Sequence, residues 1–420
     1  MDLKGTLPSP LNAVCPKCKR QLPVRLHGLS RFLVCHGCGN AVHRDTATGY
    51  LTERRGYNSR LLKPYLEPGD EGELFGRPYL VTGWVRKKET NTSYSWAEYH
   101  LFNPVHGFAQ LSVYEGHWTF HEQLKVYPRA SGIEEILIHE RNAYERFNSY
   151  KCSVLEAAGE FSRDVNDDQR AKVQEYISPP YMLTRELDPD ELAWYWGRYV
   201  EPGGIKEAFG KAEAPPPRKG VGAAQPLRLA IDKNVLKTIS VFAVAVILLT
   251  QLLFWSIDSG SLIGSWNLPA KQSDPAKGEM VETPSFDLRS RYGAVEVLVF
   301  PVALENRWFS LSGALINEHT GEARSFLMDI EYYSGHEGGE QWSEGKRSDG
   351  IILSALPAGR YHLELYPAYD SRTPVTSFNV QVQGSPTLWS NMWLILMLAM
   401  IFPLITWYRV TSFENKRWGE

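Results

Sequence analysis

Four of the five cysteines in this 420-residue chain fall in two closely spaced pairs. Cys15 and Cys18 form the first pair and Cys35 and Cys38 the second, giving the pattern C-x2-C-x16-C-x2-C. Two intervening residues let both thiolates of a pair face one tetrahedral ion, and the overall spacing is typical of structural tetrathiolate zinc sites. Because four thiolates close the coordination sphere, we predict a structural Zn²⁺ rather than a catalytic one.

The same cysteines could instead be redox pairs or free thiols. A redox C-x-x-C normally follows a strand and opens a helix, and neither pair has that context. Gly39, directly after Cys38, suits the positive φ of a knuckle turn. We therefore favour zinc, held in a ribbon over residues 1–58.

Polar residues crowd this segment. Basic side chains are placed to offset the charge of four thiolates, and three histidines are alternative ligands in principle, although surface positions suit them better. The basic residues are Lys17, Lys19, Arg20, Arg25 and Arg31, and the histidines are His27, His36 and His43.

The whole chain has a net charge of −3, which argues against a strongly basic nucleic-acid binder. With 43% hydrophobic and 22% charged residues, it is expected to fold into two to four domains. The fifth cysteine, Cys152, is expected to be a small buried side chain. All cysteines lie in the first 152 residues, which fits a reducing compartment for that part.

Two stretches are long and apolar enough to cross a membrane. Residues 238–257 and 389–408 contain no charged side chain, and 20 residues span a hydrocarbon core of about 30 Å. We assign transmembrane helices to residues 235–257 and 388–408. The first ten residues lack an apolar core, so no signal peptide is expected.

The flanking charges predict an orientation. Five basic residues lie between residues 218 and 237 and three between 409 and 417, whereas the nearest ones on the other side are Lys271 and Arg372. Positive charge resists translocation. We therefore expect both termini, including a tail over residues 409–420, to be cytoplasmic and residues 258–387 to lie outside.

Residues 59–210 are rich in aromatic side chains and in short β-type runs separated by turn residues. Ser95-Trp96-Ala97-Glu98-Tyr99 is echoed by Tyr195-Trp196-Gly197-Arg198-Tyr199, which suggests two related half-modules. We predict a cytoplasmic β-rich module. The Pro-rich residues 211–234 that follow read as a spacer with little to bury.

Several runs of this module resemble the bacterial family called domain of unknown function 4178. They include GELFGRPYLVTGWV, YSWAEYHLFNP, VLEAAGEF, which carries a G-E-F turn, and VQEYISPPYMLTREL. The resemblance covers roughly residues 60–210, the ribbon, the two-span layout and the tail. It implies a membrane-linked accessory factor of envelope stress, with protein partners and a link to polyamine-related enzymes. It assigns no catalytic residue.

Residues 258–387 contain at least six strand-like runs, which predict an antiparallel β-sandwich. The expected fold class is thus mainly β and multidomain: a zinc ribbon, a β-rich module, and two transmembrane helices that enclose an extracytoplasmic sandwich.

The preferred function is a non-enzymatic adaptor or sensor in the bacterial inner membrane, with protein partners on both sides and no nucleic acid. One alternative is a membrane-tethered nucleic-acid binder that uses the ribbon. Another is an enzyme with an unrecognised site among His100, His106, His117 and His121, which lack metal-type spacing. Recognition of a partner is expected to use the aromatic surface around Trp96, Tyr99, Trp196 and Tyr199, unless these rings are core.

Overall fold

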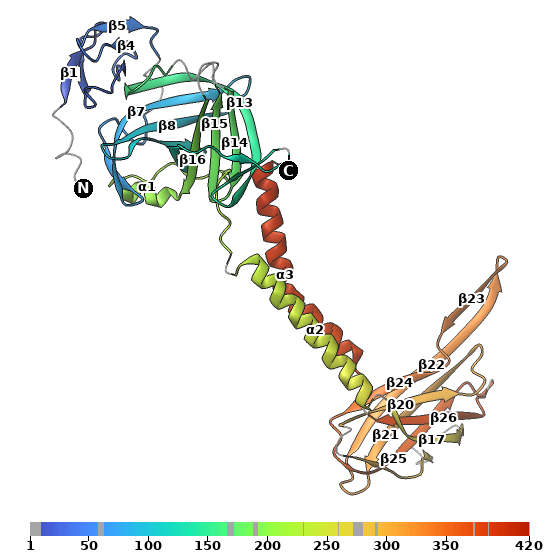
Figure 1. The fold of residues 1–420 in the computed structure, drawn as a ribbon. Coiled ribbons are helices and arrows are strands. Elements are labelled where there is room, and N and C mark those ends of the chain that lie inside the picture. The colour runs from blue at the N-terminus through green and yellow to red at the C-terminus, as the bar shows by residue number, and fades with distance from the viewer. Residues whose placement is uncertain are drawn as a thin grey trace. The chain divides into compact units, whose positions relative to one another are not determined.

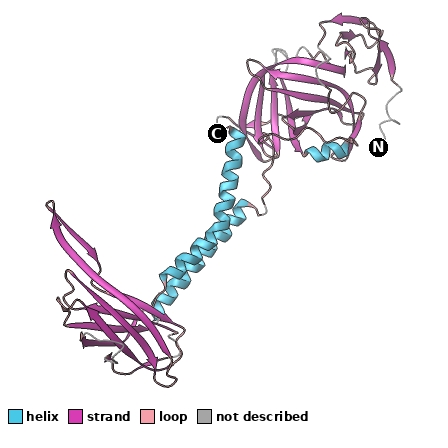
Figure 2. Cartoon of the chain, turned by 180° about the vertical axis from the view of Figure 1, so that it is seen from behind, coloured by secondary structure: helices cyan, strands magenta, loops and turns pink. Residues whose placement is uncertain are grey.

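The computed structural model describes residues 10–57, 63–133, 135–165, 172–187, 192–229, 231–258, 260–271, 280–289, 293–372, 374–384 and 386–419 (Figures 1 and 2). The chain divides into two compact units. The first comprises Met1–Ala230 with Thr406–Glu420, and the second comprises Ile231–Ile405.

The N-terminal ribbon of the first unit consists of short antiparallel strands. β1 (Leu11–Val14) pairs with β2 (Gln21–Val24) in a separate hairpin. β3 (Phe32–Val34), β4 (Ala41–Arg44) and β5 (Leu51–Arg54) follow in order and join the large sheet of the unit. The ribbon is therefore not an isolated domain, because β3 pairs with a strand of the neighbouring barrel.

The larger part of this unit is a closed antiparallel barrel. Its strands pair in the order β7-β8-β9-β10-β16-β15-β14-β13, and β13 pairs back with β7. Their bounds are β7 Arg77–Glu89, β8 Ser95–Asn103, β9 Gly107–Tyr114, β10 His117–Gln123, β13 Asn142–Phe161, β14 Lys172–Ser178, β15 Tyr181–Leu187 and β16 Leu192–Val200. β6 (Glu71–Leu74) extends the β7 edge, and β11 (Arg129–Ala130) and β12 (Ile136–His139) lie beside β13.

The long strand β13 makes closure possible. Residues 145–151 pair with β14, and residues 152–159 pair with β7. The barrel thus consists of two meanders, β7–β10 and β13–β16. The echoed aromatic motifs lie on the second strand of one meander and the fourth strand of the other, so they are not equivalent positions.

The two faces of the barrel sheet differ. One face carries an apolar cluster that includes Tyr99, Leu101 and Trp118, and the short helix α1 (Pro202–Ala208) adds Ile205 to it. The other face carries polar groups, and groups on strands well separated in the sheet interact there: Glu98 on β8 lies near enough to Glu175 on β14 to act on it electrostatically. Such contacts are expected of the face that lines a barrel interior.

The predicted spacer is not a free linker over its whole length. Lys219 N donates to Glu115 O at 2.9 Å, and Ala224 is buried in a cluster with Ile177, Met182 and Tyr199. Alanine and glycine have little surface to bury, but they allow the backbone to approach the barrel closely, which the composition of the segment did not reveal.

Two helices are long and apolar enough to cross a membrane: Lys233–Ser256 within α2 (Lys233–Asp258), and α3 (Trp389–Trp418). The predicted spans, 235–257 and 388–408, overlap them, each extending one residue beyond the helix segment given. The predicted tail at 409–420 is, however, a continuation of α3 as far as Trp418. No helix-breaking residue separates Tyr408 from Arg417, and Lys416 and Arg417 suit a helix C-terminus.

Two β-sheets occupy residues 261–384 of the second unit and share one apolar core. The four-stranded sheet has the order β17-β26-β20-β24, and the six-stranded sheet has β18-β25-β21-β22-β23 with β19 against β25. The bounds are β17 Ser261–Pro269, β18 Val281–Glu282, β19 Phe286–Leu288, β20 Ala294–Pro301, β21 Arg307–Asn317, β22 Ala323–Glu337, β23 Glu340–Gly345, β24 Asp349–Ser354, β25 Gly359–Tyr369 and β26 Ser377–Gly384. This is the two-layer arrangement of a β-sandwich.

Candidate metal centre

Two turns of identical construction present the four cysteines. In the first, Cys15 N donates to Arg20 O at 2.9 Å and Lys19 N donates to Cys15 O at 3.0 Å. The turn over residues 35–40 repeats both hydrogen bonds, at 2.9 and 2.8 Å. Each turn needs a positive φ at its fifth residue: Gly39 has 69°, as expected, and Lys19 adopts 61° despite its side chain.

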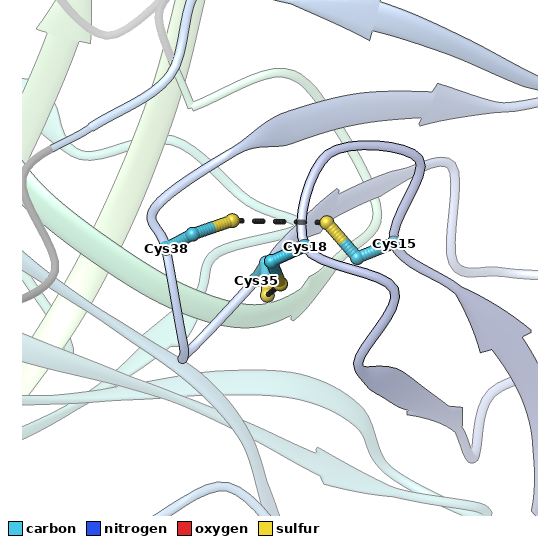
Figure 3. Close-up of side chains that lie close together, drawn as sticks. All are labelled: Cys15, Cys18, Cys35 and Cys38. Atoms are coloured by element: carbon cyan, nitrogen blue, oxygen red, sulfur yellow. Dashed lines mark hydrogen bonds between the residues drawn. The ribbon is translucent and has the colours of Figure 1, made fainter.

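The four sulfur atoms converge on one point between these turns (Figure 3). Cys15 Sγ lies 3.7 Å from Cys38 Sγ, and Cys18 Sγ lies 3.6 Å from Cys35 Sγ. A tetrahedral ion with metal–sulfur bonds of about 2.3 Å requires sulfur–sulfur separations of about 3.8 Å. The predicted ligands therefore form a possible metal site whose donor geometry fits a tetrahedral ion.

The thiols differ in how easily they lose a proton. Burial raises the pKa of Cys35 to about 12, whereas the backbone N–H of Arg20 is the main cause that lowers the pKa of Cys18 to about 7. Thiolates, not thiols, bind metal ions. Metal uptake must therefore displace protons from this site.

A third turn has the same backbone construction without cysteine. Asp45 N donates to Tyr50 O at 3.0 Å, Gly49 N donates to Asp45 O at 2.8 Å, and Gly49 has a φ of 75°. Asp45 Oδ1 accepts from Ala47 N at 2.9 Å and Thr48 N at 2.8 Å, which lowers the Asp45 pKa, the Thr48 N–H contributing most. The sequence signal, an acceptor followed four residues later by glycine, was present but missed.

Glu160 joins the cysteine-bearing ribbon to the barrel. Its carboxylate accepts hydrogen bonds from Arg25 N and Leu26 N at 3.0 and 3.1 Å and from Ser30 Oγ, and its side chain is buried. The predicted G-E-F turn at 159–161 is instead the end of β13, where it pairs with β3. Gly159 is required there because a Cβ would approach Thr82 O to 2.5 Å.

A cavity of about 370 Å³ lies at this junction. Leu22, Arg25 and His36 line it from the ribbon, and Glu67 and Trp84 line it from the other side, with Glu160 at its wall. Its lining is thus apolar with charged groups of both signs.

The four candidate histidines do not converge. His121 Nε2 hydrogen-bonds Ser112 Oγ at 2.9 Å, and burial lowers the His121 pKa to about 4. His117 contacts Tyr199 Oη at 3.1 Å, and burial is the main cause that lowers its pKa. Within the residues that the structure describes, none of the candidate histidines belongs to a group with metal-ligand geometry.

Sequence reasoning missed a buried polar cluster beside His121. Lys87 Nζ lies 2.8 Å from Glu98 Oε2, and both side chains are nearly inaccessible. Glu175 hydrogen-bonds Tyr150 Oη at 2.9 Å, and burial raises the Glu175 pKa to about 7. The residues lie on four different strands, so no local spacing could have revealed their proximity.

The expected aromatic surface is largely core. Tyr99 stacks on Trp118 and is buried, and Tyr199 is buried against His117. Trp96 and Trp196 are half-buried, and both indole N–H groups donate within the module, to Glu98 and Tyr144 respectively. These rings hold the barrel together.

Residues 67–202 match the family model described as Domain of unknown function (DUF4178), in agreement with the resemblance seen in the sequence. No curated protein matches the chain. Among solved structures, infectious bursal disease virus Gt strain matches at 11% identity, covering 90% of this chain and 69% of that one, with a TM-score of 0.16. The VP2 subviral particle of the same virus matches at 10% identity, over 90% and 70%, with a TM-score of 0.17. Scores this low carry no argument about fold or function.

Proposed function

We propose that this protein is a non-enzymatic adaptor or sensor, anchored in a bacterial cytoplasmic membrane by α2 and α3. Its first unit is cytoplasmic, its sandwich lies outside, and Cys15, Cys18, Cys35 and Cys38 hold a structural Zn²⁺. Family resemblance adds a role near envelope stress and polyamine-related enzymes.

The C-terminal end of α3 supports this topology. Arg417 is almost inaccessible, and its guanidinium donates to Gly222 O at 3.0 Å and Gln225 O at 2.7 Å, and also to Ala223 O. The segment that precedes α2 and the end of α3 thus belong to one unit. This shared unit supports a topology in which α2 begins and α3 ends on the same face of the membrane. The flanking Lys and Arg residues favour the cytoplasmic face.

A closed thiolate sphere supports a structural role for zinc. Cys15 and Cys35 are fully buried, and all four positions of a tetrahedral ion would be filled by protein. Such an ion fixes the two knuckle turns and, through β3, the ribbon edge that faces the barrel.

The cavity at the ribbon–barrel junction is the observation that carries the adaptor function. It is lined by two parts of the chain at once and combines apolar walls with Arg25 and Glu67, a mixture suited to a protein segment. We assign the cytoplasmic partner to this cavity.

Crosslinking and affinity capture of the full chain from native membranes tests the assignment. We expect a specific protein to be captured by the wild type, and its yield to fall at least severalfold with Arg25→Ala and Glu67→Ala. Both changes leave the backbone hydrogen bonds to Glu160 in place.

Tyr50→Ala is the matched control, because Tyr50 is an exposed ribbon residue outside the cavity. It should capture the partner like the wild type, and all three variants should retain their metal. Equal capture by the cavity variants, or capture of nucleic acid alone, would overturn the proposal.

A further inference from the structure

The outer face of the six-stranded sheet carries a second set of side chains with metal-ligand geometry. Glu282 lies on β18, and His362 and Glu364 lie two residues apart on β25. Each offers one ligand atom, and these atoms lie within 4.8 Å of one another. From this arrangement we infer that the sandwich binds a divalent ion of the zinc class through Glu282, His362 and Glu364.

The direction of these side chains follows from the strand alternation. Tyr361, Leu363 and Leu365 are buried in the sandwich core. Successive side chains of a strand point to opposite faces. His362 and Glu364 therefore share the outer face, where both are partly accessible to solvent.

The pairing of β18 with β25 brings two like charges together. Glu282 is the direct cross-strand partner of Glu364 in the antiparallel register. Such partners have Cβ atoms about 5 Å apart, and like charges at this position destabilise a sheet. A divalent cation between the two carboxylates would turn this repulsion into attraction.

His362 is oriented as a metal ligand requires. Its Nδ1 lies 3.2 Å from Glu318 Oε1, while its Nε2 lies 3.8 Å from Glu364 Oε1. Ser285 Oγ also donates a hydrogen bond to Glu318 Oε1, which holds this carboxylate beside His362 Nδ1. Metal-bound histidines typically donate their second ring N–H to a carboxylate in this way.

The backbone around the site is fixed on rigid elements. Thr283 N donates to Leu363 O at 3.0 Å, and Leu363 N donates to Thr283 Oγ1 at 2.9 Å. This reciprocal pair lies next to the Glu282–Glu364 pair, and Leu363 separates the two β25 ligands along the strand. The ligand positions are thus set before any ion binds, which reduces the ordering cost of binding.

The donor set indicates the ion. One imidazole nitrogen and two carboxylate oxygens suit Zn²⁺ and lack the sulfur ligands of the ribbon site. Three protein ligands leave a fourth position open for water or for a group from another molecule. The two sites therefore differ in kind: the ribbon site is closed and the sandwich site is open.

Equilibrium dialysis of the full chain in detergent against micromolar Zn²⁺, followed by elemental analysis, tests the inference. The wild type should bind about two Zn²⁺ per chain. His362→Ala and Glu282→Gln should each reduce this to about one. Glu318→Gln should keep the site but weaken it about 10-fold or more, because only the orienting partner changes.

Two variants separate this site from the ribbon. Cys35→Ser should lose the first equivalent and keep the second. His336→Ala, which removes an exposed histidine from β22 of the same sheet, should retain both. A second equivalent that survives His362→Ala, or a wild type that binds one ion only, would overturn the inference.

Discussion

The barrel and the sandwich are both antiparallel, but what they bury differs. The sandwich core is a continuous set of apolar side chains, among them Phe309, Leu363 and Val380, all fully inaccessible. The barrel buries the Lys87–Glu98 ion pair and His121, and half-buries Glu175, on one face of its sheet. The barrel sheet is closed and the two sandwich sheets are not, and among the described residues only the sandwich has an almost purely apolar interior.

This difference affects the stability of each unit and the place where its chemical groups lie. Apolar burial stabilises a fold in proportion to area, whereas burial of charged groups costs free energy that their pairing repays only in part. A sandwich with such a core is a stable platform, and its chemistry lies on its surface. The barrel carries its chemical groups inside, where their state is sensitive to pH and to substitution.

The largest expected effect is the loss of structure in the ribbon, but not in the sandwich, when the ribbon metal site is removed. Cys35→Ser should remove the ribbon metal and unfold the ribbon, because structural zinc contributes on the order of 10 kcal/mol to such small folds. The sandwich should be unaffected. Hydrogen exchange of the full chain, with elemental analysis, measures both.

Cys152→Ser is the control for this change. Cys152 is buried in β13 but is not part of the metal site, so the metal content should not change. A Cys35→Ser ribbon that stays protected without metal would show that zinc is not structural.

An intermediate effect is expected from the sandwich core. Phe309→Ala should lower the free energy of unfolding of the second unit by about 3–5 kcal/mol, because a large apolar ring is lost and a cavity remains. Protection of residues 261–384 from exchange should fall while the barrel keeps its own. Ser310→Ala, one position along β21, should cost far less, and comparable losses would contradict the proposed core.

A smaller effect is expected from a substitution in the barrel interior. This substitution should raise the free energy of unfolding, whereas Phe309→Ala should lower it. Burial holds the Glu175 pKa at about 7 instead of 4.5, so the folded barrel retains a proton that the unfolded chain releases. Stability should therefore fall as pH rises from about 4.5 to about 7. Glu175→Gln should remove this loss and stabilise the first unit above pH 7, by about 1–2 kcal/mol, since solvent reaches part of this side chain.

His121 supplies the matched test on the acid side. Its pKa is lowered from 6.5 to about 4, so the contribution of the neutral imidazole is present above pH 6.5 and is lost as pH falls toward 4. His121→Gln should flatten that acid limb without changing the alkaline one. The free energy of unfolding should be measured with denaturant across this pH range. If neither Glu175→Gln nor His121→Gln changed its pH dependence, these two groups would not titrate with shifted pKa values.

Several features could be predicted from local sequence patterns because their physical cause is local. The spacing of the cysteines predicted which side chains come together in the ribbon. The length of the two charge-free stretches predicted the two long helices, and the alternating strand-like runs with turn residues between them predicted the two-sheet domain. The family match over residues 67–202 agrees with the resemblance read from the strands.

What could not be predicted depends on long-range pairing. Closure of the barrel requires β13 to pair with β7, some 70 residues earlier in the chain. Glu160 meets the backbone of Arg25 from 135 residues away. The Glu282–His362–Glu364 set exists only in the register of β18 with β25. In each case no local sequence pattern marks the residues, and only the pairing of distant strands brings them together.

The Arg417 contact has a consequence for the order of synthesis. Gly222 and Arg417 are separated by 195 residues, and the second unit is an insertion between two segments of the first. The ribosome synthesises the barrel strands long before it reaches Arg417. Until then, water must solvate the carbonyl groups of residues 222–225. The contact between Arg417 and residues 222–225 is therefore the last part of the first unit to form. Its formation therefore shows that the inserted sandwich and both long helices have been synthesised.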